Sequence, residues 1–406
     1  MRVLMLSWEY PPHIVGGIGT HVTALVPALA RLGVHVTLVT PRWGGGDFIT
    51  RLGNNAVVYR IDMPTGRSGN YFGDAKLANT LLQEAADKLW ADDGAGGGPH
   101  GFDLIHAHDW LVAFAADALK GLHKTPLVAT LHATERGRGR GYLSTELSYA
   151  INTTEWWLAY QAWRVITVSR SMAQEVRAYL NLPADKIDVV PNGVDAAPFD
   201  ALVGEDLSSF RQRWAAPGHP LVFFVGRLHY EKGAQVLIEA VPRVLASAPD
   251  ARFVIAGMGP MLDSLQRRAL ELGVSDRVTL AGFVSDDERN RLFHVSDVAV
   301  FPSLYEPFGI VALEAMAACC PVVVTDVGGL REVVRHEETG IVVHPDNPDS
   351  LAWGVLQVLG GKEKAMERAK RAARMVRSEY SWDRIAERTA EVYDRVVGER
   401  GQVVWT

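Results

Sequence analysis

Short apolar runs alternate with longer segments of helical spacing along the chain. In the first half, four runs have the length and continuous hydrophobicity of strands buried on both faces: residues 2–7, 34–39, 102–106 and 127–132. Between the first two runs, residues 22–29 carry apolar side chains at the spacing of one helix face. The order strand, glycine turn, helix, strand is typical of a doubly wound parallel sheet.

The same alternation restarts after a turn at residues 191–195. Five more strand-like runs follow, at residues 221–226, 253–256, 278–283, 298–301 and 321–324. Two successive sets of strands and helices predict an α/β protein with two Rossmann-like, doubly wound domains. We place the first domain at residues 1–197, the second at 198–378 and a final helix at 379–406.

Three stretches fit this alternation less clearly. Residues 41–76 are Gly-rich and predict an irregular loop. The Arg/Gly stretch 136–141 is either a solvated loop or a lid that closes over bound substrate. Trp156, Tyr160 and Trp163 share one stripe at helical spacing, which is more typical of a core-facing side than of a sugar platform.

The stretch 304–315 follows a strand-like run and opens a helix of small and apolar residues that continues to Cys320. Pro307 suits the first helical turn, because its missing N–H would be unpaired there anyway. Glu306 then sits at the helix mouth, and free amides point toward a ligand from Phe308, Gly309 and Ile310. Such amides, together with the helix dipole, attract phosphate.

Glu314 follows Glu306 by eight residues. In a helix this places the two carboxylates roughly 12 Å apart along the axis and on broadly the same side. That gap exceeds the about 5–9.5 Å of a glycosidase carboxyl pair. The pair suits one extended ligand with a sugar, a diphosphate and a ribose in line. Alternatively, Glu306 is a capping residue and Glu314 a surface residue.

Two further loops have phosphate-binding character. The turn at residues 16–19, with Gly17 inside it, lets the backbone approach a ligand at a helix start, although many such folds carry a glycine turn for structural reasons. Arg227 and Lys232 lie five residues apart on a loop that enters another helix. A guanidinium fork and a point charge suit a diphosphate, unless both are simply surface cations on a tight turn.

Glycines at the ends of two strand-like runs predict a place where a nucleoside could lie against the backbone. Gly257 and Gly259 follow the run at 253–256, and Phe283 ends the run at 278–283. We take these three residues as the nucleoside environment.

Polar residues end two of the first-half strands, where open α/β sheets bind ligands. Asp109 follows His106 and His108, and could simply cap a helix at residues 110–119. His132 ends the run at 127–132 and could be a structural histidine. The His-x-His-Asp group could suggest a metal, but no third and fourth ligands follow at zinc spacing. We therefore expect no metal and no other cofactor.

Four motifs together resemble those of the retaining, nucleotide-sugar-dependent glycosyltransferases of family 4 (group 1), particularly glycogen and starch synthases. They are E-x7-E at 306–314, G-R-x5-K-G at 226–233, H-A-H-D-W at 106–110 and T-L-H at 130–132. The resemblance covers nearly the whole chain. It implies a GT-B fold, in which two Rossmann-like domains face a cleft and the C-terminal helix crosses back onto the first domain.

The resemblance also implies roles for these residues. Glu306 would lie at the donor sugar and Glu314 at the ribose hydroxyls. Arg227 and Lys232 would neutralise the leaving nucleoside diphosphate. His132 would contact the transferred sugar, Asp109 would face the sugar pocket, and the glycine loop would face the donor phosphates and the acceptor. One departure is Ile14, where bacterial glycogen and starch synthases usually carry a lysine.

The implied activity is transfer of α-glucose from ADP- or UDP-glucose to the non-reducing end of an α-1,4-glucan. Retention in this family is generally explained by same-face attack, in which the departing phosphate takes the acceptor proton. No D-x-D occurs in the chain, so cations and helix dipoles would have to stabilise the leaving group. Alternatives are another family-4 acceptor (trehalose- or sucrose-type, or lipid-linked), a nucleotide-sugar epimerase of the same fold, or a non-catalytic nucleotide-sugar sensor.

Composition and charge narrow the partners. The formal net charge of −6 disfavours a general nucleic-acid or anionic-membrane surface. No apolar run approaches the ~18 residues of a transmembrane helix, and residues 1–6 are too short for a signal sequence. Cys319 and Cys320 are adjacent and are typical of small buried residues in a reducing compartment. We expect a cytoplasmic protein whose partners are a nucleotide sugar and a carbohydrate acceptor.

Overall fold

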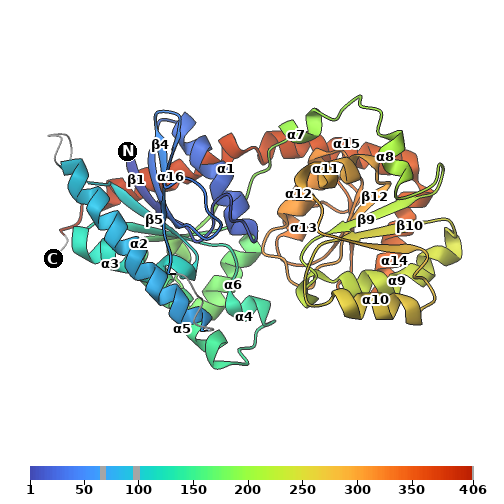
Figure 1. Cartoon of the computed structure of the whole chain (residues 1–406), viewed down its shortest axis with the longest axis horizontal. Helices are drawn as coiled ribbons and strands as arrows, with labels where there is room; N and C mark the ends of the chain where they lie inside the picture. The colour runs from blue at the N-terminus through green and yellow to red at the C-terminus, as the bar shows by residue number, and fades with distance from the viewer. Residues whose placement is uncertain (65–69, 95–100, 405–406) are drawn as a thin grey trace. The chain divides into compact units, whose positions relative to one another are not determined.

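The computed structural model describes residues 1–64, 70–94 and 101–404 (Figure 1). The chain divides into two compact units. Unit 1 combines Met1–Asn192 with the C-terminal residues from Trp382 on, and unit 2 is Gly193–Ser381. The boundaries that we placed from the sequence, after residues 197 and 378, lie a few residues from these divisions.

Unit 1 is built on one sheet, which has eight strands within the described residues. Its order is β3-β4-β2-β1-β5-β6-β7-β8, and every pairing is parallel except β3 with β4. The continuous apolar runs form its central strands, as expected for strands covered on both faces. The strands are β1 (Arg2–Leu6), β2 (His35–Pro41), β3 (Ile49–Leu52), β4 (Ala56–Ile61), β5 (Leu104–His108), β6 (Leu127–Leu131), β7 (Arg164–Thr167) and β8 (Ile187–Val189).

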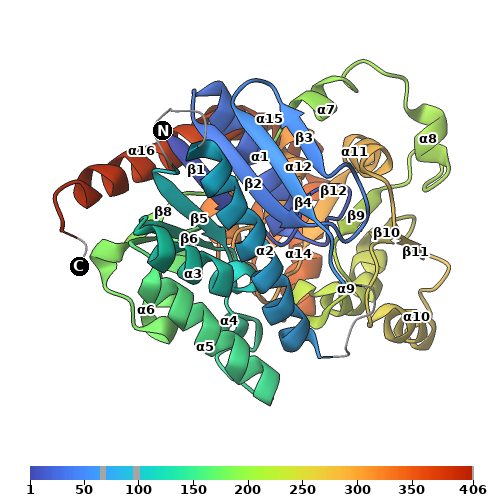
Figure 2. The same cartoon turned by 60° about the vertical axis from the view of Figure 1, so that its left-hand side comes forward.

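The helices of unit 1 form two groups. Helices α2 (Tyr71–Gly94), α3 (Ala113–His123) and α5 (Glu146–Gln161) pack in a row (Figure 2). A second group pairs α1 (Gly17–Arg31) with α16 (Trp382–Arg400), and their apolar sides join the core of the sheet. Shorter elements complete the unit: η1 (Trp110–Val112), α4 (Glu135–Arg138), α6 (Arg170–Leu180) and η2 (Ala184–Lys186).

Unit 2 repeats the architecture with six parallel strands in its described residues, in the order β11-β10-β9-β12-β13-β14. They are β9 (Leu221–Val225), β10 (Arg252–Ala256), β11 (Val278–Gly282), β12 (Val298–Phe301), β13 (Val322–Thr325) and β14 (Ile341–Val343). Valine and phenylalanine side chains of these strands fill the core with the helices that follow them.

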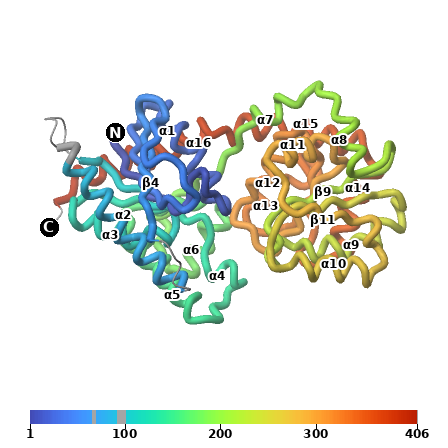
Figure 3. The backbone as a smooth tube through the Cα atoms, viewed as in Figure 1, coloured from blue at the N-terminus to red at the C-terminus, as the bar shows by residue number. Residues whose placement is uncertain are grey.

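The longer helices of unit 2 lie in two layers about this sheet (Figure 3). One layer has α9 (Ala234–Ser247), α10 (Leu262–Glu271) and α14 (Pro348–Gly360). The other has α11 (Asp286–Val295), α12 (Ile310–Ala317) and α15 (Lys362–Glu379). Short helices are α7 (Ala197–Asp200), α8 (Ser208–Gln212), η3 (Tyr230–Lys232) and α13 (Leu330–Val333).

The prediction that residues 41–76 form an irregular loop was wrong for most of the stretch. Its described part holds β3, β4 and the start of α2, and residues 65–69 lie outside the described residues. The short strand β3 pairs antiparallel with β4 at the sheet edge, which its few apolar residues did not reveal.

The expected aromatic stripe was also wrong. Trp156 is 41% exposed and Tyr160 58% exposed on α5, whereas Trp163 lies beyond that helix and packs against the core. Helical spacing places residues on one side of a helix, but it does not say whether that side faces the core or solvent.

None of the helices in the described part of the chain is long and apolar enough to span a bilayer. Cys319 and Cys320 are both free, and only Cys320 is fully buried.

Candidate active site

The loop that follows β9 is fixed by backbone contacts to other loops of unit 2. Gly233 ends this loop with φ 74°, and a Cβ there would overlap the carbonyl oxygen of Pro302. The carbonyl of Glu231 accepts the amides of Leu304 and Tyr305, at 2.7 and 3.3 Å. The loop carrying Arg227 and Lys232 is therefore held against the stretch that leads to Glu306.

Lys232 and Glu306, 74 residues apart in sequence, form a direct ion pair. The Lys232 Nζ lies 2.7 Å from Glu306 Oε2, and the two side chains are 21% and 17% exposed. Ser303 Oγ donates to the same carboxylate oxygen at 3.3 Å. Arg227 lies five residues before Lys232 and pairs with Glu231 at 3.5 Å; its side chain is 48% exposed. These cations lie on one loop next to Glu306, as a diphosphate site requires.

The helix after Glu306 begins later than the sequence predicted. Helix α12 starts at Ile310 and ends at Ala317, so Pro307 lies before the helix and not in its first turn. The reason is Gly309, which adopts φ 103° as the N-cap, a conformation that a helix cannot include. Within the part of the chain that the structure describes, the N–H groups of Phe308, Gly309 and Ile310 donate no hydrogen bond.

Two helices of unit 2, α9 and α12, begin without a side-chain cap. Helix α9 follows Gly233 and helix α12 follows Gly309, both glycines in the left-handed region. A capping side chain would occupy the first amides, whereas its absence leaves them for a bound anion. Both loops therefore have the chemistry of phosphate sites.

The glycines predicted to lie near the nucleoside contact the Arg227 loop through their backbones. Gly257 has φ 139° and lies against the carbonyl of Gly226, and Gly259 has φ 159° and lies against Leu228. The Gly257 amide donates to Gly282 at 2.7 Å. Phe283, immediately after, is 80% exposed. The exposed Phe283 ring is therefore available to stack on a base beside the packed glycine backbone.

Glu314 lies in α12 and is buried, with 12% of its side chain exposed. Burial raises the pKa of its carboxyl group, and Arg289 on α11, at 3.4 Å from Oε1, opposes that rise. The sequence pointed to Glu314 but not to Arg289, which only the packing of α11 beside α12 brings into contact.

In unit 1, Asp109 does not cap a helix. Its side chain makes no capping bond to the short η1 that follows, and its Oδ1 accepts the backbone amide of His132 at 2.7 Å. The chain continues into α3 only at Ala113, so the predicted helix 110–119 was also wrong at its start. Asp109 thus joins the carboxyl ends of β5 and β6 and holds the backbone at His132.

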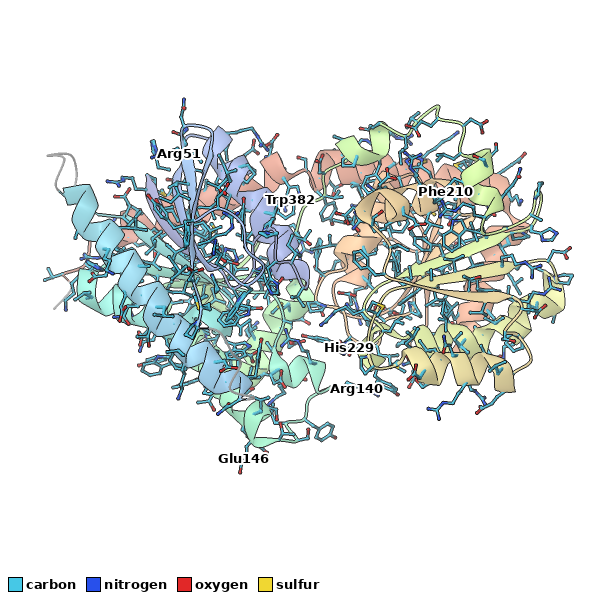
Figure 4. All side chains as sticks on the ribbon, viewed as in Figure 1. Arg51, Arg140, Glu146, Phe210, His229 and Trp382 are labelled. Atoms are coloured by element: carbon cyan, nitrogen blue, oxygen red, sulfur yellow. The ribbon has the colours of Figure 1, made fainter. Side chains whose placement is uncertain are left out.

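Four imidazoles gather around this junction. His108 Nδ1 lies 3.1 Å from His132 Nε2, His21 Nδ1 lies 2.7 Å from Asn192 Oδ1, and His106 bonds Thr130 and Tyr393. Trp382, labelled in Figure 4, packs edge-on to the His21 ring at 5.3 Å. Burial lowers the pKa of His21 to about 4 and of His106 to about 3.

Burial also lowers the pKa of His108 and of His132 well below its usual value. All four rings are therefore neutral near pH 7, so His132 can donate or accept a hydrogen bond without carrying a charge. His21, His108 and His132 each bring one ring nitrogen within 4.8 Å of the others, an arrangement that could hold a metal ion. The third histidine comes from α1, which the spacing of the His-x-His-Asp group could not show.

The glycine turn before α1 is partly occupied by the protein itself. Glu9 Oε2 accepts the amides of Val15, Gly16 and Gly19 at 3.0, 3.0 and 3.3 Å. Gly17 opens the helix beside them, and its amide is not among these three donors. The Glu9 carboxylate therefore already accepts amides of the turn that was expected to bind the donor phosphates.

The Arg/Gly stretch is more ordered than a free loop. Thr134 caps the short α4 through the Gly137 amide, and the amides of Arg140, Gly141 and Tyr142 return to carbonyls of the same turn. Glu155, fully buried on α5, accepts the Glu135 amide. Burial raises the pKa of Glu155 well above its usual value, and Arg138 opposes that rise.

The structure adds residues that the sequence did not single out: Glu9, His21, Glu155, Asn192 and Arg289. For Glu9 a signal existed, since it is an acidic residue three positions after the buried strand β1. The others act through partners on distant segments and leave no local pattern.

Replacing Asp109 by asparagine should change how stability depends on pH. Burial raises the pKa of Asp109 to about 7 from 3.8, so the folded protein keeps a proton that the unfolded chain has already lost between about pH 4 and 7. Asp109 therefore makes the fold less stable as pH rises through that window. Asparagine can accept the same amide without this penalty, and it tolerates the φ of 60° at this position.

The expected result is that Asp109→Asn gains stability over the natural protein as pH rises from 5 to 7, by at most about 2.7 kcal/mol, since one proton contributes about 1.36 kcal/mol per pH unit. Urea denaturation at both pH values measures it. Asp117→Asn, at a partly exposed position of α3 where the carboxylate accepts the Trp157 indole N–H, serves as the control. Parallel pH profiles for Asp109→Asn and the natural protein would show that Asp109 is ionised in the folded state.

Each unit is thus an α/β unit on a largely parallel sheet; unit 2 carries Lys232, Arg227 and two uncapped helix starts, and unit 1 carries a cluster of neutral histidines. Residues 208–375 match the family described as glycosyl transferases group 1, and residues 15–197 match glycosyltransferase family 4. The chain is 41% identical over 398 residues to an uncharacterized glycosyltransferase of Methanocaldococcus jannaschii, covering 97% of this chain and 98% of that protein.

The chain is also 35% identical over 418 residues to a glycogen synthase of Mycobacterium tuberculosis, covering 99% of this chain and 96% of that protein. The protein belongs to the group 1 glycosyltransferases. Among solved structures, a sucrose-phosphate synthase from Thermosynechococcus elongatus superposes with a TM-score of 0.80 at 22% identity, covering 98% of this chain and 99% of that one. This likeness confirms the predicted α/β GT-B fold with two Rossmann-like sheets.

Proposed function

We propose that this protein is a retaining glucosyltransferase that moves α-glucose from ADP- or UDP-glucose to the non-reducing end of an α-1,4-glucan. The observation that carries the proposal is the Lys232–Glu306 pair beside two uncapped helix starts. The identity of 35% to a glycogen synthase along nearly the whole chain supports the choice of a glucan acceptor.

The donor phosphates would bind at the cationic loop of unit 2. Lys232 would exchange its contact with Glu306 for one with the diphosphate, and Arg227 would offer its planar fork to the same group. The N-terminal amides of α9 and α12 would add uncharged hydrogen-bond donors to the phosphates. As the bond from the sugar to the diphosphate breaks, negative charge grows on the leaving oxygen, and preorganised donors stabilise that charge.

Glu306 would then orient the sugar. Its carboxylate, released from Lys232, accepts hydrogen bonds from sugar hydroxyls and faces the positive charge that develops at the anomeric carbon. We assign Glu306 no role as a nucleophile or general base. The departing phosphate takes the proton of the attacking hydroxyl on the same face, which conserves the α configuration.

Unit 1 would contribute neutral contacts to the sugar. His132 bonds a sugar hydroxyl through its uncharged ring or its backbone carbonyl, and Asp109 fixes that backbone through the amide at 2.7 Å. We propose that transfer needs no metal ion, because the phosphate donors of unit 2 are cations and amides.

The experiment that tests the activity offers ADP-glucose and UDP-glucose in turn with glycogen, glucose and glucose 6-phosphate. Chain extension of glycogen, with an α product by proton NMR and release of the nucleoside diphosphate, supports the proposal. Transfer to a small sugar alone would instead support the alternative of a family-4 transferase with another acceptor. Donor cleavage with no transfer to any acceptor would favour the epimerase alternative and contradict the proposal.

Replacing Glu314 by alanine should weaken binding of the nucleotide donor by roughly 1–3 kcal/mol, because a buried hydrogen bond to the ribose is lost. Titration calorimetry with the nucleoside diphosphate measures this loss. Asp286→Ala is the matched control: Asp286 also pairs with Arg289, at 3.0 Å, but its side chain is 88% exposed. Equal affinities for Glu314→Ala and the natural protein would remove the ribose role.

A further inference from the structure

A hollow in unit 2 lies at the carboxyl ends of β13 and β14, of which β14 is the edge strand of the sheet. We call it the β14 hollow; its volume is about 630 Å³, and its polar wall consists of Asp326, Arg331, Arg335, His336, His344 and Ser350. The wall includes none of the residues assigned to transfer. Its size falls in the range of small-molecule sites, and the carboxyl edge of a parallel sheet is where such sites form.

The floor of the β14 hollow is apolar. Val334, Val342 and Val343 line it, and Trp353 from the first turns of α14 stands beside them with 44% of its surface exposed. Helix α14 approaches the strand closely because its next residue is Gly354, where a Cβ would lie 2.6 Å from a Val343 methyl. This close packing brings the indole of Trp353 to the hollow, where a ring of a ligand can stack on it.

The polar wall presents hydrogen-bond donors. His336 Nδ1 accepts the Val342 amide at 3.0 Å, so that nitrogen carries no proton and the ring offers its Nε2–H instead. Ser350 Oγ accepts the His344 amide at 3.0 Å, which leaves its hydroxyl hydrogen to donate elsewhere. With the guanidiniums of Arg331 and Arg335, these groups form a set that suits phosphate oxygens.

The present partners of the two arginines can be exchanged. Arg331 pairs with Asp326 at 3.3 Å, and Arg335 pairs with Glu338 at 3.1 Å and with Glu379 at 3.6 Å. All five side chains are about half exposed, and ion pairs at such sites contribute only about 0–1 kcal/mol. A phosphate, which binds guanidinium through two parallel bonds, can compete with them.

We propose that the β14 hollow is a second binding site, for a phosphorylated ring compound, with the phosphate at Arg331 and Arg335 and the ring on Trp353. A nucleotide and a sugar phosphate both have this chemistry. This second site does not depend on the proposed transferase activity, because the experiment that tests it measures binding.

The test uses the full chain carrying Lys232→Ala, so that nucleotide binding at the transfer residues is weakened. Calorimetry is done with AMP, with glucose 1-phosphate and with inorganic phosphate. We expect AMP or glucose 1-phosphate to bind more tightly than inorganic phosphate. The ring compound with the higher affinity shows whether the ligand is a nucleotide or a sugar phosphate. Adding Arg335→Ala or Trp353→Ala should weaken that binding by about 10-fold or more.

Arg268→Ala is the matched control, since Arg268 of the same unit also pairs with two carboxylates, Glu239 and Glu271, and its side chain is 44% exposed. It should leave the affinity unchanged, and circular dichroism confirms that each variant is folded. Three results would overturn the proposal: no ring phosphate binds, inorganic phosphate binds as tightly as both ring compounds, or Arg335→Ala and Trp353→Ala bind like the control.

Discussion

Replacing Lys232 by alanine is expected to slow glucosyl transfer by about 10²-fold or more, as for the loss of one preorganised donor to developing charge. The ammonium group lies 2.7 Å from Glu306 on a loop fixed by Gly233 and by the Glu231 carbonyl. Because the backbone of this loop is held before the donor arrives, only the Lys232 side chain has to move to the diphosphate, and its charge is in place when the phosphate leaves. Steady-state kinetics with saturating donor measures kcat directly.

The control for this prediction is Lys364→Ala, which removes an exposed lysine of α15 in the same unit. Its rate should equal that of the natural protein. Lys232→Ala also leaves the Glu306 carboxylate without its cation, so its thermal unfolding is recorded beside the kinetics. A folded Lys232→Ala protein with nearly normal turnover would remove the cationic loop from the mechanism.

Replacing Gly233 by alanine is expected to destabilise unit 2 by about 3 kcal/mol and to weaken donor binding with it. A positive φ costs an L-residue roughly 1–2 kcal/mol, and a side chain forced into packed backbone costs typically about 1–3 kcal/mol more. At Gly233 both apply, because φ is 74° and the new methyl would overlap the Pro302 carbonyl.

Gly218 separates these two effects. Its φ is 82°, but no atom lies within 4 Å of the place where a Cβ would stand. Gly218→Ala should therefore cost only about 1 kcal/mol, from the backbone conformation alone. Urea denaturation of both variants gives the comparison. Equal losses would mean that the loop next to Lys232 can move away from Pro302, and that its fixed position is not a property of the fold.

The sequence predicted the architecture well because the strands are continuous apolar runs separated by glycine turns. Such runs mark parallel strands covered on both faces, and nothing distant is needed to recognise them. The errors arose where tertiary contacts decide. The start of α12 depends on the left-handed Gly309, which is packed against Leu330 and the Glu306 side chain. The position of Pro307 in the sequence does not show this packing of Gly309.

Within the candidate site, the sequence pointed to residues whose types carry the chemistry. Lys232 and Glu306 were both singled out, and the structure brings their side chains into contact; their roles stay predictions. Asp109 was harder, since a carboxylate before an apolar segment reads equally well as a cap. Its partner, the His132 amide, is 23 residues away and reaches it only because β5 and β6 are neighbours in the sheet.

The most direct measurement is a crystal structure of the protein with a nucleotide-glucose donor bound. We expect the diphosphate in hydrogen-bond contact with Lys232 and Arg227, the glucose at Glu306 and the ribose at Glu314. A donor whose phosphates touch neither cation, or whose ribose lies away from α12, would contradict it.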